Sequence, residues 1–387
     1  MLSAVELDLT PEQREIQALA RDFAEAEIVP HAAEWDREHR FPREVVARLA
    51  ELGLMGVCVP EELGGAGADF LSYVLVLEEI SRADAGIGVT VAVHTSAATL
   101  PIVAFGTSEQ QDELVPPLAT GVRLGAFALS EAEAGSDARS LRSRAEADGD
   151  GWRVTGVKQW ITNGAHAGTI LVFARSAAGV SCFLVEGEAE GLQATPEHSK
   201  LGLHSSSTTD LVLEGVRVGH ERLLGEEGKG FRIAMATLEG GRIGIAAQAV
   251  GIAQAAYDTA RAYALERRQF GRRIADFGPI QGKLADMATE IDAARLLVHR
   301  AAWLRDRGEP HGEAGAKAKL FASSVARRHS GEAIQILGGY GYTKEFPVER
   351  YYRDARITEI YEGTSEIQRL VIARSILELK RREVAAG

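Results

Sequence analysis

The sequence predicts an α+β fold with several domains, in which a helical region, an antiparallel β region and a second helical region follow one another. Apolar residues recur at helical spacing in the first third and in the last part of the chain. Between these parts, apolar and polar residues alternate as they do in strands. The chain has 387 residues, which is too long for one ordinary core. We therefore expect domains at residues 1–122, 123–230 and 231–387.

The first helix is predicted by its capping residues. Thr10 suits the N-cap, Pro11 suits the first helical position, and Gln13 stands three residues after the cap. Pro30 should end or kink the helix. Its apolar face should hold Ile16, Leu19, Ala20, Phe23 and Ile28.

Four further helices are expected before residue 122. One starts near Pro42 and ends at Gly53. Residues 71–82 have one apolar face, and the apolar residues 86–100 suit a buried helix. Ser108 and Gln111 have capping-box spacing and should open a short helix toward Pro116. The helix from Pro42 should bury Val45, Val46, Leu49 and Leu52.

The middle region has the pattern of short strands. Residues 152–160 alternate large apolar and polar side chains, as a half-buried strand does. Residues 169–173, 180–185 and 210–218 suit further strands, separated by turn-rich stretches. Short strands at close spacing favour an antiparallel sandwich or barrel over βαβ units.

The last region has the pattern of long helices. Residues 243–265, 279–307 and 314–337 are Ala-rich or apolar at helical spacing, and residues 347–357 and 365–381 suit shorter helices. These lengths favour a bundle of the four-helix type, whose exposed ends often pair across subunits.

Composition narrows the possible partners. The net charge is −12 and the pI about 5.4, which argues against nucleic-acid binding because that needs a basic surface. Cys58 and Cys182 lie far apart in apolar runs, which favours buried thiols in a reducing compartment. We find no signal peptide and no uninterrupted apolar run of membrane-spanning length. We expect a cytoplasmic protein without membrane insertion, with a mature mitochondrial-matrix form as the alternative.

Common ligand motifs are absent or incomplete. No Gly-x-Gly-x-x-Gly follows a predicted strand, which argues against a Rossmann dinucleotide site. Residues 225–230 resemble a phosphate loop, but Gly230 stands where Ser or Thr should follow Lys229. The histidines lack metal-ligand spacing, so we expect no metal site and a packed His94.

One carboxylate near the C-terminus has an unusual setting. Glu362 precedes Gly363, which frees the backbone beside it, and a helix start follows at once. Ser365 and Gln368 have capping-box spacing, and a helix N-terminus suits an anionic group such as a cofactor phosphate. By itself, this pattern is more often an exposed Glu in a helix-capping turn.

Two loops that follow predicted strands carry further candidate groups. Residues 127–137 enter a loop with Ser hydroxyls and backbone donors suited to a polar ring or a phosphate. Residues 160–163 end the next strand with an aromatic ring and a hydroxyl. Each loop alone is also typical of a protein surface or of a strand end.

Taken together, these segments resemble the acyl-CoA dehydrogenase family along nearly the whole chain. The resemblance is closest to the short-chain and short/branched-chain members, and the motifs stand in the family's order. They are residues 60–65, 128–131, 135–137, 160–163, 266–271, 335–339, 353–355 and the Glu362 segment.

The resemblance implies the acyl-CoA dehydrogenase fold, with FAD between the β domain and the bundle. It also implies a homotetramer, a dimer of dimers, in which the flavin reaches a neighbouring subunit. The implied reaction is FAD-dependent α,β-dehydrogenation of a short-chain acyl-CoA to the trans-2-enoyl-CoA. In that reaction Glu362 takes the α-proton, flavin N5 takes the β-hydride, and the electrons pass to an electron-transferring flavoprotein.

The resemblance also assigns the FAD contacts. Leu129, Ser130, Trp160 and Thr162 would lie by the flavin ring, with the Thr162 hydroxyl near N5. Arg267 would bind the pyrophosphate, because a forked guanidinium fits two phosphate oxygens. The segment 335–339 would reach the FAD across a subunit contact. The full implied set is Phe127, Leu129, Ser130, Gly135, Ser136, Trp160, Ile161, Thr162, Arg267, Phe270, Gln335, Ile336, Leu337, Gly338, Gly339, Thr364, Ser365 and Glu366.

A second implied set would contact the acyl-CoA, and it consists of Ser136, Glu239, Arg242, Tyr361 and Gly363. Desolvation should raise the pKa of Glu362 toward neutrality, which suits a base. Some family members place the base on the long helix, at the position that Gly241 holds in this chain. Glu239 is two residues out of register with that position, so Glu362 keeps the role.

Three positions depart from the family pattern. Glu133 would repel phosphates unless it points to solvent, Gly278 replaces a common flavin-contacting Gln, and His204 replaces a common Arg. Other functions also fit the sequence. These are a short/branched-chain substrate, an oxidase that uses oxygen, and a flavin or acyl-CoA binding protein without turnover.

Overall fold

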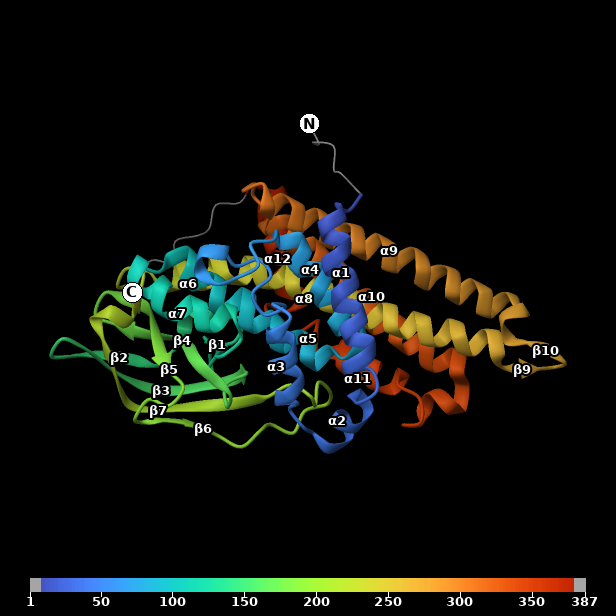
Figure 1. Ribbon diagram of the computed structural model, residues 1–387, viewed down its shortest axis with the longest axis horizontal. Helices are drawn as coiled ribbons and strands as arrows, with labels where there is room; N and C mark the ends of the chain where they lie inside the picture. Colours follow the sequence, from blue (N-terminus) through green and yellow to red (C-terminus); the bar gives the residue numbers. More distant parts are fainter. Residues whose placement is uncertain (1–7, 379–387) are drawn as a thin grey trace.

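The computed structural model describes residues 8–378 and shows the β-sheet region at one end of the molecule, with the long helices reaching toward the opposite end (Figure 1). Within this range, the helices before the sheet include π-helical turns at Ala24–Ile28 and Val93–Thr99. The α-helices are α1 (Pro11–Phe23), α2 (Ala32–Glu38), α3 (Arg43–Glu51), α4 (Phe70–Ala83), α5 (Ala85–Ala92), α6 (Leu100–Phe105) and α7 (Ser108–Ala119).

The start of α1 is the predicted capping box. The Thr10 hydroxyl accepts from the Gln13 N–H, and the Gln13 side chain accepts from the Thr10 N–H. The helix ends before Pro30, as predicted. Two burial predictions are wrong: Leu19 is exposed because it lies beside the buried face, and Leu52 is exposed because it follows the last turn of α3.

The start of α7 lies one residue earlier than predicted. Thr107 is the N-cap and exchanges hydrogen bonds with Gln110, so Ser108 and Gln111 do not form the capping box. The helix continues through Pro116 to Ala119. Pro116 and Pro117 each deprive the helix of one backbone hydrogen bond, because proline has no N–H.

The segment Ala85–Phe105 forms one continuous apolar helix across α5 and α6. An 18-residue window of this segment has a mean hydropathy of 1.6, so its length and composition suit a membrane span, whereas the sequence led us to expect no such run. However, 83% of that window is buried inside the protein, where α5 contacts α4 and the long helix α8 (Gly230–Glu266). His94 is packed in this segment, as predicted: its ring lies between the Leu118 carbonyl and the Gly125 N–H, and burial lowers its pKa to about 4.

The middle region is one hydrogen-bonded sheet whose order is β6-β7-β3-β2-β4-β5-β8. All four predicted strands are present, and most pairs are antiparallel. The expectation of an antiparallel sheet is wrong at two pairs, because β1 pairs with β4 in parallel and β2 meets β4 in parallel at Arg144 and Arg175. The strands are β1 (Leu124–Ala128), β2 (Arg144–Asp148), β3 (Gly151–Thr162), β4 (Ala167–Ser176), β5 (Gly179–Glu186), β6 (Leu192–Ala194), β7 (Thr208–Gly219) and β8 (Leu223–Leu224).

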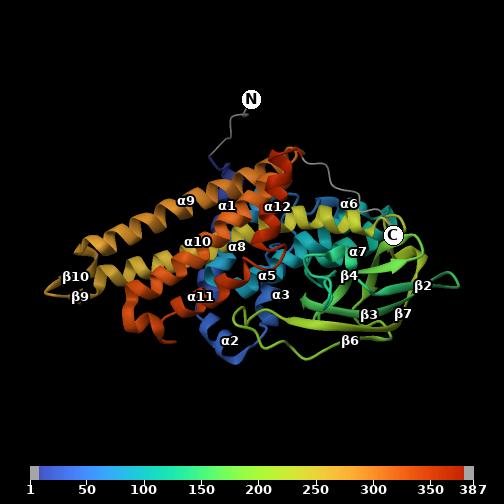
Figure 2. The same cartoon turned by 180° about the vertical axis from the view of Figure 1, so that it is seen from behind.

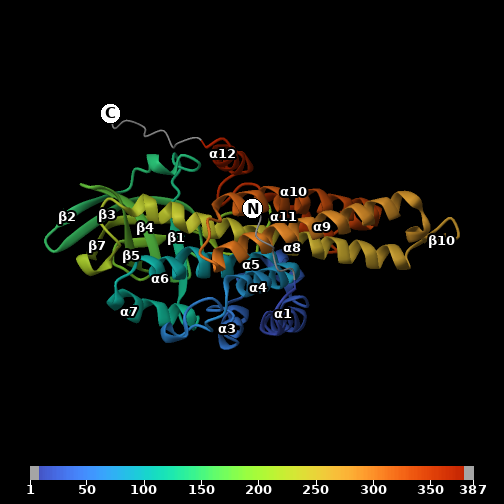
Figure 3. The ribbon, with the colours of Figure 1, turned by 90° about the horizontal axis from the view of Figure 1, so that it is seen from above.

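The long helices after the sheet pack side by side as the sequence predicts. Helix α8 contacts α4, α9 and α10, and its small residues form much of the largest core. Figure 2 shows α10, α11 and α12 on the face turned away in Figure 1, and α12 lies over α10 in Figure 3. The bounds are α9 (Gly278–Asp306), α10 (Gly312–Leu337), α11 (Val348–Ile357) and α12 (Ser365–Ile376), and a short hairpin of β9 (Arg268–Gln269) and β10 (Arg272–Arg273) joins α8 to α9.

The start of α12 also lies one residue before the predicted cap. Thr364 is the N-cap and accepts from the Ile367 N–H, so Ser365 and Gln368 do not form a capping box. The Gln368 side chain turns back and donates to the Gly363 carbonyl at 2.7 Å. The last three residues of the predicted helix, 379–381, lie outside the described residues.

Candidate functional site

The turn between α11 and α12 places Glu362 against the backbone of α8. Both Glu362 and Gly363 have left-handed backbone, with φ of 53° and 89°. This conformation is uncommon for a residue with a side chain and is frequent at functional sites. A Cβ added at Gly241 would lie 2.2 Å from Glu362 Oε2. The carboxylate therefore occupies the space that a side chain at position 241 would need.

The Glu362 carboxylate is desolvated. Its Oε2 atom is buried and has no hydrogen-bond partner among the described residues. Burial raises the pKa of Glu362 to about 7, while the positive charges of Lys319 and Arg242 oppose this rise. A carboxyl group with such a pKa exchanges its proton readily at neutral pH.

Side chains from two helices and from the turn itself surround this carboxylate. Arg242 is buried on α8, one residue from the contact at Gly241. The Tyr361 hydroxyl donates to the Gln248 side chain, which in turn donates to the Ala85 carbonyl at 2.7 Å. Lys319 is buried on α10 and donates to the Gly363 carbonyl at 2.8 Å. The base, its backbone and its charged neighbours thus come from distant parts of the chain.

Glu239 lies on α8, two residues before Gly241, and faces another part of the molecule. Its carboxyl carbon would be 3.3 Å from a Cβ added at Gly312, so the group lies over the start of α10. Ser136 and Gly135 lie in an exposed loop after β1. Among the residues that the resemblance assigns to acyl-CoA, Arg242, Tyr361 and Gly363 are therefore close to Glu362, whereas Ser136 lies in the exposed loop and Glu239 lies over the start of α10.

A buried ion pair fixes the loop that holds Leu129 and Ser130. Lys158 is fully buried in β3 and donates to Glu131 at 2.6 Å and to the Leu129 carbonyl at 3.3 Å. The Glu131 carboxylate also accepts from the N–H groups of Arg142 and Ser143. The Ser130 carbonyl accepts from the Gln159 N–H at 2.9 Å. These bonds hold the 129–131 loop against the strand that leads to Trp160.

The end of β3 is shaped by two left-handed residues, Trp160 and Asn163, with φ of 62° and 66°. The Trp160 ring is 59% exposed and lies 4.2 Å from the His198 ring. Asn163 is fully buried and donates to the carbonyls of Thr90 and Gly125. The bonds of Asn163 anchor the strand end to α5 and β1, which leaves an exposed aromatic surface beside Thr162.

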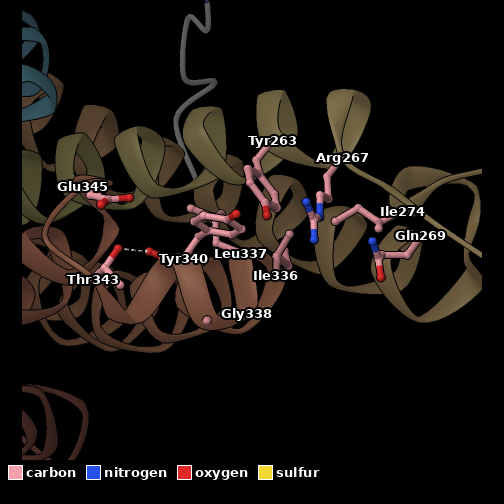
Figure 4. A pocket seen from close by; sticks show the side chains of 11 residues that line it. Tyr263, Arg267, Gln269, Ile274, Ile336, Leu337, Gly338, Tyr340, Thr343 and Glu345 are labelled. Carbon is pink, nitrogen blue, oxygen red and sulfur yellow. Dashed lines mark hydrogen bonds between the residues drawn. The ribbon is translucent and has the colours of Figure 1, made fainter.

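A cavity of about 520 Å³ lies beside the end of α8 (Figure 4). It brings together Arg267 and the turn 336–339, which are far apart in the sequence. The Arg267 guanidinium lies over the Tyr340 ring. Among the described residues, this guanidinium forms no salt bridge with a carboxylate. The lining residues are Tyr263, Arg267, Gln269, Ile274, Ile336, Leu337, Gly338, Gly339, Tyr340, Thr343 and Glu345.

The remaining predicted FAD residues lie around this cavity or on α12. Phe270 is 93% exposed at the tip of the β9–β10 hairpin, again with left-handed backbone. Gln335 is exposed beside the cavity but does not line it. Thr364 and Ser365 start α12, and Glu366 is exposed in its first turn.

One chain does not bring all the predicted FAD residues together. The hairpin β9–β10 and the sheet lie at opposite ends of the molecule in all three ribbon views (Figures 1–3). Phe127 lies near the end of β1, Leu129 follows that strand, and Ile161 is buried near the end of β3. These three residues therefore lie at the end of the molecule that holds the sheet. Arg267, Phe270 and the 335–339 segment belong to the other end.

The structure places the three departures from the family pattern. Glu133 is exposed and pairs with Arg142 at 2.6 Å, so it points to solvent. Gly278 is exposed at the start of α9, with open space where a side chain would stand. His204 stacks on His39 and bonds Asp36, which Arg353 holds from α11. His204 therefore belongs to a junction between α2 and α11.

Sequence reasoning missed two buried lysines, Lys158 and Lys319. Each had a signal: Lys158 stands in an alternating strand, and Lys319 stands on the Ala-rich face of a helix with Ala322 and Ser323. A lysine is almost never fully buried unless a partner holds it. No group of three or more His, Cys, Asp or Glu side chains with metal-site geometry occurs within residues 8–378.

Sequence comparison finds three matching family models along the chain. They are described as the N-terminal, middle and C-terminal domains of acyl-CoA dehydrogenase, and they match residues 10–122, 126–216 and 228–377. A curated relative, the mitochondrial short-chain specific acyl-CoA dehydrogenase of Bos taurus, is 50% identical over 380 residues. That match covers 97% of this chain and 92% of the relative.

Solved structures match over nearly the whole chain. Butyryl-CoA dehydrogenase from Megasphaera elsdenii is 42% identical with a TM-score of 0.95, covering 96% of this chain and 100% of that one. A chain from a structure described as the electron transferring flavoprotein of Acidaminococcus fermentans is 45% identical with the same TM-score and coverage. An acyl-CoA dehydrogenase from Bacillus anthracis complexed with FAD is 37% identical with a TM-score of 0.93, covering 97% of this chain and 68% of that one.

Proposed function

The chain belongs to the acyl-CoA dehydrogenase family, and from this premise we propose that it dehydrogenates a short-chain acyl-CoA thioester between the α- and β-carbons, with FAD as cofactor and Glu362 as the base. One observation carries the assignment of the base. The Oε2 atom of Glu362 is buried against Gly241, without a hydrogen-bond partner among the described residues, at the turn where the resemblance places the base.

Glu362 is suited to take a proton from the α-carbon of a thioester. Such a proton is weakly acidic, so the base must be strong enough to take it and still be ionised at the working pH. Burial raises the pKa of Glu362 to about 7, which increases its basicity, while Lys319 and Arg242 keep the ionised form accessible. The desolvated surroundings also strengthen any donor that stabilises developing enolate charge on the substrate carbonyl.

The residues of this chain fit FAD at two places. The cavity beside α8 offers a guanidinium, an aromatic wall and glycines that leave room for close approach, which suits a pyrophosphate next to a flat ring. The 129–131 loop and the exposed Trp160 offer polar groups beside an aromatic surface. When bound, FAD supplies the acceptor for the hydride that leaves the β-carbon.

A homotetramer, a dimer of dimers, explains why these two places are far apart in one chain. The Arg267 cavity of one subunit then completes the site formed by the sheet end of another. Phe270, 93% exposed at the hairpin tip, offers an apolar side chain that a neighbouring subunit could cover. We propose domain boundaries at 1–122, 123–230 and 231–387, which the family matches at 10–122, 126–216 and 228–377 support.

A short acyl group is the proposed substrate, and an electron-transferring flavoprotein is the proposed acceptor. The similarity to short-chain specific and butyryl-CoA dehydrogenases supports the first. Close packing beyond the base also supports it: a Cβ added at Gly244, one turn along α8 from Gly241, would meet Leu77 at 3.2 Å and Tyr73 at 3.4 Å. The similarity to the Acidaminococcus fermentans chain supports the second.

Anaerobic mixing with a panel of acyl-CoAs tests this proposal. The purified FAD-bound protein should bleach most rapidly with butyryl-CoA, more slowly with isobutyryl-CoA, and least with octanoyl-CoA. The reduced protein should pass electrons to an electron-transferring flavoprotein faster than to oxygen. Binding of butyryl-CoA without bleaching would contradict the enzymatic assignment, and rapid oxygen uptake would favour an oxidase.

A further inference from the structure

Lys319 is a buried cation whose partners lie on the turn that carries Glu362. Its side chain is only 1% exposed, in the middle of α10. The ammonium group donates to the Thr358 carbonyl at 2.9 Å and to the Gly363 carbonyl at 2.8 Å. Among the described residues, no carboxylate lies within salt-bridge distance of it. The lysine thus spans the turn from one side to the other.

The turn needs such support because Glu362 and Gly363 both have left-handed backbone. A non-glycine residue in this conformation costs free energy and persists only when its surroundings hold it. Besides Lys319, the Gln368 side chain donates to the Gly363 carbonyl at 2.7 Å, and the Ser323 hydroxyl donates to the Thr358 carbonyl at 2.9 Å. Two helices, α10 and α12, therefore fix the backbone while the carboxylate lies on α8.

The charge of Lys319 also acts on Glu362. A buried ammonium group is costly unless neighbouring oxygens and a negative charge compensate for it. Of the carboxylates that raise the pKa of Lys319 against the effect of burial, Glu362 is the strongest. The other charged group that faces Glu362 is Arg242 from α8, and Tyr73 from α4 and Tyr361 from the turn face it as neutral phenols.

Lys319 and Arg242 differ in what they can contribute. The resemblance assigns Arg242 to the acyl-CoA, whereas Lys319 bonds only the backbone carbonyls of the turn. Without Lys319, the ionised carboxylate would lose the positive charge on its α10 side, and burial would favour the protonated acid more strongly. A protonated Glu362 cannot accept the α-proton.

We propose that Lys319 is a positioning residue for Glu362, which fixes the backbone of the turn and places a buried positive charge beside the carboxylate. This inference rests on the proposed function, because it assumes that Glu362 is the base. A purely structural role for Lys319 would instead change the stability of the turn or the overall rate, without moving the pH at which Glu362 loses its proton.

Four variants of the FAD-bound full-length protein separate these roles. Lys319→Gln keeps a hydrogen-bond donor but removes the charge, whereas Lys319→Arg keeps the charge. Ser323→Ala removes a neutral donor to the same Thr358 carbonyl and is the matched control. Glu362→Gln removes the base itself and identifies its signals.

The measurement is the pH dependence of kcat/KM with butyryl-CoA, together with the infrared band of the Glu362 carboxylic acid, which is recognised by its loss in Glu362→Gln. In Lys319→Gln, the pH midpoint of kcat/KM and the pH midpoint of the infrared band should both rise by about 1 pH unit, as expected for loss of a neighbouring opposite charge. In Lys319→Arg and Ser323→Ala they should stay at the wild-type value.

An unchanged midpoint in Lys319→Gln would overturn the inference, whatever happens to its rate. The proposed function has a separate outcome, because it fails if Glu362→Gln turns over butyryl-CoA at the wild-type rate. If Glu362→Gln is inactive and the Lys319→Gln midpoint is unchanged, only the role of Lys319 is refuted.

Discussion

At the scale of single residues, the space beside Glu362 depends on a missing side chain. Gly241 leaves room for the carboxylate, and a Cβ there would stand 2.2 Å from its Oε2 atom. The resemblance places the base of some family members at position 241, and a base there and one at Glu362 would compete for the same space in one chain. This steric argument supports the choice of Glu362 over position 241 independently of sequence similarity.

The first prediction concerns Gly241→Ala. Because α8 is rigid and buried here, the methyl group should displace the Glu362 carboxylate rather than the helix. A displacement of about 1 Å should lower kcat about 100-fold. Stopped-flow bleaching with butyryl-CoA measures the loss. Gly282→Ala on α9, where a Cβ meets nothing within 4 Å, is the control and should react at the wild-type rate.

The second prediction uses the raised pKa of Glu362, which burial moves from 4.5 to about 7. The folded state holds this proton more tightly than the unfolded state does, so the folding stability contributed by Glu362 falls as pH rises from about 4.5 to 7. Glu362→Gln does not titrate. Its thermal midpoint should therefore exceed that of the wild type by a few degrees at pH 8, and the gap should shrink toward pH 5. A gap that is constant with pH would contradict the raised pKa.

The sequence identified Glu362 because its neighbours form a recognisable segment. It did not reveal Lys319, whose bonds to Thr358 and Gly363 join two helices that are separate in the sequence. Hydrophobic periodicity assigns a helix face, but it does not say which backbone carbonyls that face meets. The charge around the base was therefore accessible only from the tertiary structure.

At the scale of elements, the loop after β1 and the strand β3 act as one unit because Lys158 and Glu131 join them. This pair is buried, and the Glu131 carboxylate accepts from two backbone N–H groups as well. Removing one member leaves an uncompensated charge in the interior, which is far more costly than losing an exposed pair.

The third prediction compares Lys158→Met with Arg142→Ala. Lys158→Met should lower the free energy of unfolding by about 3–5 kcal/mol, because it leaves the buried Glu131 carboxylate without its positive partner. It should also weaken FAD retention, since the 129–131 loop loses its support. Arg142→Ala removes only the exposed pair with Glu133 and should change stability by less than about 1 kcal/mol. Urea unfolding and flavin absorbance measure both, and equal effects would refute the distinction.

The sequence predicted the elements better than their ends and partners. Two helix N-caps lie one residue earlier than predicted, at Thr107 and Thr364, because a Thr-Ser pair offers two candidate caps with similar chemistry. The parallel pairing of β1 with β4 was also missed. Alternating side chains show that a segment is a strand, but they do not show which neighbour it pairs with or in which direction.

At the scale of the whole molecule, the candidate cofactor site is divided between two ends of the chain. The exposed Phe270 and the Arg267 cavity lie at the hairpin end, away from the sheet. The sequence similarity implied this division, because it assigned residues 335–339 to a contact across subunits. The residue pattern alone gave no means to separate the two groups.

The fourth prediction tests the assembly through Phe270→Asp. Asp tolerates the left-handed backbone at this position, so the change mainly replaces an exposed aromatic surface with a charge. If a neighbouring subunit covers Phe270, the variant should form fewer tetramers and retain less FAD. Light scattering after size-exclusion chromatography measures the first. Val122→Asp, at a site that is 81% exposed, is the control and should remain like the wild type.

The central claim is that Glu362 removes the substrate α-proton, and one comparison tests it most directly. Glu362→Gln is compared with Glu359→Gln. Glu359 lies close to Glu362 in the sequence, but its carboxylate pairs with Arg327 and Arg356 and has no proposed role in the reaction. Both variants should fold and bind FAD. Each is mixed anaerobically with butyryl-CoA, and flavin bleaching is followed.

We predict that Glu362→Gln bleaches about 10³-fold or more slowly than the wild type, within the range of a lost general base. Glu359→Gln should bleach at nearly the wild-type rate. Wild-type bleaching by Glu362→Gln would contradict the account.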